Sequence, residues 1–116
     1  MAKIISFMEW YIYDGGKSIG KKGSENGIIV DDIESHYGAR ITLEKDGVTA
    51  PFSVTFGIYG LLFHTRFAER ENEARDYINL TKEKIKGIYT HGEIPENERD
   101  DAWINRYNEL LSSLMD

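Results

Sequence analysis

The most apolar stretch of the chain reads Pro51-Phe-Ser-Val-Thr-Phe-Gly-Ile-Tyr-Gly-Leu-Leu-Phe-His-Thr-Arg-Phe67. It is rich in β-branched and aromatic residues and carries almost no charge, which is typical of buried strands. Large apolar side chains stand at every second position from Phe52 to Ile58, so they share one face of a strand. Gly60 allows a bulge or a tight turn before the alternation resumes. The stretch therefore predicts the central strand, or strand pair, of a sheet.

Three more strands are predicted before this stretch, over residues 4–13, 27–34 and 39–45. The last alternates most clearly: apolar side chains point one way, and Arg40, Thr42 and Glu44 point the other. This pattern predicts a half-buried strand with one face in water.

The segment Gly15–Gly27 separates the first two predicted strands. It holds five glycines and three lysines, which predicts a mobile surface loop. Gly16-Lys17-Ser18 is the ending of a phosphate-binding loop, but the required earlier glycine is replaced by Tyr11. We therefore expect no nucleotide to bind there.

The pattern changes from a period of two to a helical period after Glu69. One amphipathic helix is predicted from Glu69 to Gly87 or Gly92, and a second from about Pro95 to Ser113. Strands followed by helices predict an α+β domain over residues 1–116. Its antiparallel sheet has about four to five strands in the N-terminal two-thirds. The two C-terminal helices cover one face of that sheet.

The net charge of −6 is concentrated at the C-terminal end, where residues 93–116 hold seven acidic residues against two arginines. A nucleic-acid-binding protein would need a basic stripe, which the chain lacks. An acidic segment can instead attract a basic protein partner, with Asp100 and Asp101 as candidate contacts. The alternative is an ordinary solvated helix face.

The chain contains no cysteine, which excludes disulfides and thiolate metal sites. Glu9 interrupts the N-terminal apolar residues too early for a signal peptide, and no apolar run approaches the ~20 residues that a membrane helix needs. We expect a cytoplasmic protein that has no membrane segment.

Asp32, Glu34 and His36 stand at alternate positions and therefore share one strand face, with Asp31 on the other. Such a trio can bind a divalent cation or a basic partner. The alternative is a solvated face whose acids pair with Arg40 across a hairpin. We favour the solvated face over a metal site, expect no cofactor, and name Asp32, Glu34 and His36 as candidate contacts of a protein partner.

His64 and Arg66 share a face of the apolar stretch. Both can line a small-molecule pocket, and a histidine there can titrate near neutral pH. The alternative is a hydrogen-bonded structural histidine. No catalytic triad, paired-glutamate site or metalloprotease spacing is present, so no catalytic residue is assigned.

Residues 38–44, 51–60 and 64–67 together resemble a group of small uncharacterised bacterial proteins, some of which look like immunity proteins of toxin systems. The resemblance covers roughly residues 31–67 and contains no catalytic signature. It implies a role in binding a partner and identifies no functional residue.

The sequence thus favours a non-enzymatic protein-binding module, with an immunity-type inhibitor that occludes a basic partner site as one form. A small-molecule-binding domain or minor enzyme with a pocket near His64 and Arg66 is the alternative. A homodimer formed through an exposed sheet face is a third possibility.

Overall fold

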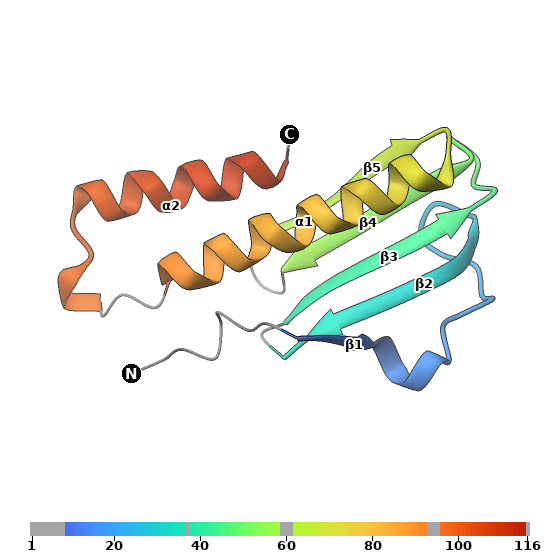
Figure 1. The fold of residues 1–116 in the computed structure, drawn as a ribbon, viewed down its shortest axis with the longest axis horizontal. Coiled ribbons are helices and arrows are strands. Elements are labelled where there is room, and N and C mark those ends of the chain that lie inside the picture. The colour runs from blue at the N-terminus through green and yellow to red at the C-terminus, as the bar shows by residue number, and fades with distance from the viewer. Residues whose placement is uncertain (1–8, 37, 59–61, 93–95, 116) are drawn as a thin grey trace. The chain divides into compact units, whose positions relative to one another are not determined.

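A computed structural model describes residues 9–36, 38–58, 62–92 and 96–115. The predicted fold class is confirmed: an antiparallel sheet occupies the N-terminal two-thirds and two helices follow it (Figure 1). The strands are β1 (Trp10–Ile12), β2 (Ile28–Ser35), β3 (Ala39–Lys45), β4 (Phe52–Ile58) and β5 (Leu62–Ala68). The helices are α1 (Glu71–Gly92) and α2 (Asp101–Leu114), with short 3₁₀ turns η2 (Tyr13–Gly16) and η3 (Glu96–Glu98).

The five strands lie in chain order, β1-β2-β3-β4-β5, and every neighbouring pair is antiparallel. The short connections after β2, β3 and β4 cause this order, because a short link joins antiparallel neighbours. The predicted boundaries agree within about two residues, except for the first strand. That strand begins at Trp10, and residues 4–8 of the prediction lie outside the described residues.

One face of the sheet carries the core, and we call it the helix-side face. Ile41 of β3 lies opposite Phe56 of β4, and Leu43 lies opposite Val54. These side chains are at most 1% exposed. Alternation along each strand places them on one side, as the sequence predicted.

The first turns of α1 pack on the helix-side face, where Ala74 and Ile78 are buried. Arg75 Nη1 donates to Asp31 Oδ2 on β2 at 3.1 Å. The guanidinium of Arg66 on β5 lies 5.6 Å from the ring centre of Tyr77. These contacts belong to a compact unit that spans Glu9–Asn79.

The second unit includes Leu80–Asp116 and contains the rest of α1 together with α2. The two helices approach closely at Gly87, which lies beside the Leu110 side chain. Lys84 Nζ donates to the carbonyl of Ser113 at 2.6 Å. No helix in the described part of the chain is long and apolar enough to cross a membrane.

The second helix begins later than predicted, at Asp101 rather than near Pro95, which itself lies outside the described residues. Asp100 is the N-cap: its Oδ1 accepts the backbone N–H of Trp103 at 2.9 Å. An aspartate that accepts this bond satisfies a donor that the helix leaves unpaired, so the helix starts there.

Candidate interaction surface

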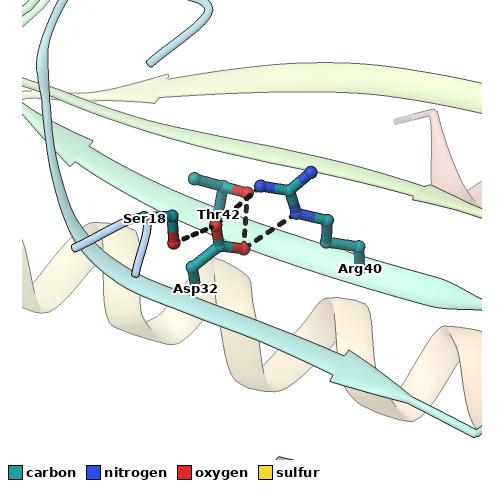
Figure 2. Close-up of polar contacts among 4 residues, drawn as sticks. All are labelled: Ser18, Asp32, Arg40 and Thr42. Carbon is teal, nitrogen blue, oxygen red and sulfur yellow. Dashed lines mark hydrogen bonds and ion pairs between the residues drawn. The ribbon is translucent and has the colours of Figure 1, made fainter. Parts of the chain in front are cut away.

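A network of polar side chains surrounds Asp32 on the other face of the sheet, which we call the loop-side face (Figure 2). The Asp32 side chain is completely buried. Arg40 binds it through two nitrogens, Nε to Oδ1 at 2.9 Å and Nη2 to Oδ2 at 2.7 Å. Thr42 Oγ1 donates to Oδ1 at 3.0 Å, and Ser18 Oγ donates to Oδ2 at 2.8 Å. Four hydrogen bonds compensate the cost of burying this charge.

The donors around Asp32 show that it serves the fold. Arg40 and Thr42 come from the neighbouring strand β3, whereas Ser18 comes from the segment before β2. The Arg40 guanidinium also lies 3.5 Å from the ring centre of Tyr13, a cation–π contact. Asp32 has no surface left for a cation or a partner. Within the described residues, no cluster of three or more acidic, histidine or cysteine side chains forms a metal site.

Glu44 is a second buried carboxylate on the loop-side face, only 1% exposed. Its Oε1 accepts the backbone N–H of Gly27 at 3.0 Å and that of Glu25 at 3.2 Å. Gly23 packs so closely on this carboxylate that a Cβ at that position would collide with it. Close approach of the backbone is a reason for glycine here.

The segment 13–27, which we call the covering loop, supplies these contacts and also pairs with β2. Gly20 N–H donates to the Ile29 carbonyl at 2.8 Å, and Ile29 N–H donates to the Lys21 carbonyl at 2.9 Å. Lys22 and Ile28 form an isolated bridge. Three further residues of the chain therefore pair with the part of β2 that β1 does not reach.

The prediction of a wet face on β3 was wrong, and the Gly15–Gly27 loop that was predicted to be mobile is hydrogen-bonded to the sheet. Thr42 and Glu44 are buried because the covering loop lies over them and donates backbone and hydroxyl groups to the loop-side face. The segment does not have the geometry of a phosphate-binding loop, because Gly16 ends a 3₁₀ turn rather than opening an α-helix. The Ser18 hydroxyl binds Asp32.

The same face has a different character at β5. Three rows of directly opposite residues run from β3 across β4 to β5: Arg40–Gly57–Phe63, Thr42–Thr55–Thr65 and Glu44–Ser53–Phe67. Each row begins with a buried or half-buried polar residue under the covering loop. The outer two rows end on phenylalanines that are 69% and 40% exposed. Thr55 and Thr65 share a hydrogen bond of 3.0 Å between their hydroxyls.

The outer edge of β5 lacks most of the usual protective features, although the strand carries one charged residue, Arg66. β5 has seven residues, pairs with β4 without a bulge, and contains no lysine, proline or glycine. Among the residues that the structure describes, no strand pairs with its other side. Natural edge strands are usually short, bulged or lysine-bearing, because an open edge can pair with another chain.

His64 and Arg66 lie on the helix-side face of β5, as their shared alternation predicted. The His64 ring meets the edge of the Phe56 ring, with centroids 5.6 Å apart, and Arg66 stands over Tyr77. Both contacts are structural. The two side chains that were predicted to line a pocket, His64 and Arg66, therefore pack against neighbouring aromatic rings.

The remaining predicted contacts belong to different units of the chain. Glu34 lies on β2 opposite Tyr11, whose ring is 5.0 Å from that of the exposed His36. Asp100 is the N-cap of α2, and Asp101 is exposed in its first turn.

An aromatic stack joins the two helices of the second unit. The His91, Trp103 and Tyr107 rings lie nearly parallel, and Trp103 Nε1 donates to the His91 carbonyl at 2.9 Å. Burial raises the pKa of Tyr89 to about 12, and the electrostatic effect of Tyr107 contributes in the same direction. A shallow hollow nearby is lined by residues that include Glu83, Lys86, Thr90, His91, Arg106 and Leu110. It is open and holds charges of both signs, so it selects no ligand class.

Comparisons with protein-family models, with curated proteins and with solved structures find no match to this chain.

Sequence reasoning missed three features of this surface: Ser18, Glu44 and the exposed pair Phe63 and Phe67. Ser18 and Glu44 carried no signal, because their partners are far away in sequence. The alternation of residues 62–68 did contain a signal for the phenylalanines, since it placed them on one face of the strand and His64 and Arg66 on the other face.

Proposed function

We propose that this protein is a non-enzymatic protein-binding module that accepts an extended segment of a partner along β5. The observation that carries the proposal is the outer edge of β5, which carries two exposed phenylalanines and with which no strand pairs among the described residues. Strand addition supplies main-chain hydrogen bonds to such an edge, and side chains at alternate positions supply specificity. Phe63 and Phe67 stand on one face and would grip apolar side chains of the added segment.

The net charge of −6 favours a basic partner, because opposite net charge speeds encounter. An immunity-type inhibitor, which occludes a basic site on a toxin, is one form of such a module. This form follows the sequence-based expectation that residues 31–67 resemble bacterial immunity-like proteins. The buried state of Asp32 and Glu44 restricts the partner contacts to other residues.

The test uses a heptapeptide that alternates lysine with phenylalanine and matches the length of β5. We expect saturable changes in the amide resonances of residues 62–68 when it is titrated into ¹⁵N-labelled protein. A peptide with proline at its centre should cause none, because proline cannot continue the ladder. Added salt should weaken binding of the lysine peptide.

The matched variants are Phe63→Lys and Val48→Lys. Both replace an exposed apolar side chain by lysine, but Val48 lies in the turn between β3 and β4. Only Phe63→Lys should abolish the peptide-induced changes. Changes that map elsewhere, or equal loss in both variants, would refute strand addition at β5.

A further inference from the structure

The loop-side residues of β5 are symmetric about its central residue, Thr65. From Phe63 to Phe67 it reads Phe-His-Thr-Arg-Phe, so the same apolar residue stands two positions to each side of Thr65. If two copies of β5 pair antiparallel about Thr65, each Phe63 faces a Phe67 and each Thr65 faces its own counterpart. All of these side chains lie on the loop-side face.

We propose that β5 of one molecule pairs with β5 of a second copy, in the antiparallel register centred on Thr65. This inference rests on the proposed strand-addition function. It states that β5 of a second copy occupies the same edge when no partner is bound. A two-fold axis through Thr65 joins two five-stranded sheets into one continuous sheet. Partner binding and self-pairing then exclude each other, so the partner must displace the second copy.

The side chains at this junction support self-pairing over an arbitrary partner strand. Two aromatic pairs stabilise a cross-strand contact by offset or edge-to-face packing. The central threonines extend a row that already contains the Thr55–Thr65 hydrogen bond. On the helix-side face, Arg66 of each copy would lie opposite His64 of the other copy. No two carboxylates and no two arginines would therefore face each other.

Self-pairing through one strand is weak. A single strand pair lies at the low end of interface sizes, below about 1,200 Å², so we expect a dissociation constant on the order of 100 μM. Two copies that each carry −6 repel each other, and added salt reduces this repulsion. Sedimentation of the wild-type chain should therefore show a monomer–dimer equilibrium that strengthens with salt. The lysine peptide should show the opposite dependence.

A cysteine-free chain allows a direct test of the register. In Thr65→Cys the two sulfurs meet at the axis, because directly opposite Cβ atoms lie about 4.5–5.5 Å apart, close to disulfide reach. We expect rapid formation of a disulfide dimer on mild oxidation. The control Thr49→Cys, in the exposed turn after β3, should react at least tenfold more slowly.

Two further variants separate this register from others. Phe63→Cys should not cross-link to itself, because the two copies of position 63 are about 13 Å apart along the strand. A mixture of Phe63→Cys and Phe67→Cys should cross-link. Equal rates for Thr65→Cys and Thr49→Cys, or self-linking of Phe63→Cys, would overturn the proposal.

The two proposals fail separately. A wild-type chain that remains monomeric up to about 1 mM at high salt, while the peptide still changes residues 62–68, would overturn self-pairing and leave strand addition standing. If the peptide also leaves β5 unchanged, strand addition itself is refuted. Binding of the peptide to a stable dimer without dissociation would contradict the shared edge.

Discussion

The two edges of the sheet have opposite designs. At the first edge, β1 has three residues, the 3₁₀ turn η2 follows it, and residues 20–22 continue the pairing with β2. At the second edge, β5 runs for seven residues with a regular register to β4. Lysines at positions 17, 21 and 22 accompany the first edge, whereas β5 has none. From the described residues we expect the first edge to resist pairing with another chain, and we propose that the second accepts it.

The covering loop extends this contrast to the loop-side face. Near the first edge, the face is polar but buried, and two carboxylates hold the loop on it. Near the second edge, it is apolar and exposed. Burial of charge and exposure of aromatic surface both cost free energy. The buried carboxylates on β2 and β3 stabilise the fold, whereas the exposed phenylalanines on β5 do not. We therefore propose that the function lies at β5.

The largest expected effect is the loss of Asp32. Asp32→Ala leaves Arg40, Thr42 and Ser18 without their acceptor, and breaking a buried ion pair costs about 3–5 kcal/mol. Since Arg40 is 31% exposed and can reach water, we expect about 3 kcal/mol, measured by urea denaturation. Asp32→Asn keeps an acceptor oxygen and should lose less. A loss below about 1 kcal/mol would mean that the network does not hold the loop.

Glu44 provides the second test of the protected side. Glu44→Ala removes the acceptor of two backbone N–H groups, which should cost about 2 kcal/mol. Glu44→Gln retains one carbonyl oxygen for Gly27 and serves as the control, with about half that loss. Amide exchange at Gly27 should accelerate more in the alanine variant. An unchanged rate of amide exchange at Gly27 would show that Glu44 does not anchor the loop.

These two carboxylates also mark the limit of what the sequence could predict. The strand order, the faces of β3 and β4 and the helical stripes follow from local alternation and short connections. The partners of Asp32 and Glu44 do not, because Ser18 and Gly27 are 14 and 17 residues away and reach them only after folding. Glycine content predicted freedom for the loop, whereas Gly23 instead permits close packing on Glu44.

Lysine substitutions at the two edges sharpen the comparison without large effects on stability. Phe63→Lys on β5 and Ile12→Lys on β1 both change exposed side chains, so each should alter the free energy of unfolding by at most about 0.5 kcal/mol. Only Phe63→Lys should abolish peptide binding and dimer formation. If Ile12→Lys has the same effect in a binding titration, the two edges do not differ in function.

A modest effect on stability is expected in the central row. Thr65→Val breaks the hydroxyl contact with Thr55 and should cost about 0.5–1 kcal/mol. The double variant Thr55→Val/Thr65→Val replaces both partners by apolar groups and should be nearly neutral. Thermal unfolding of the three proteins measures this coupling. Additive losses would show that the two hydroxyls do not interact.

Residue-resolved amide hydrogen exchange of the wild-type chain, recorded at low and high protein concentration, tests the contrast between the edges most directly. We expect the amides of Gly20, Gly27 and Ile29 to be protected at both concentrations, because each donates within the covered edge. Along β5, the amides that point away from β4 should exchange rapidly when dilute and become protected when concentrated. Protection of all β5 amides at low concentration, or rapid exchange at Gly20 and Gly27, would contradict the assignment of one closed and one open edge.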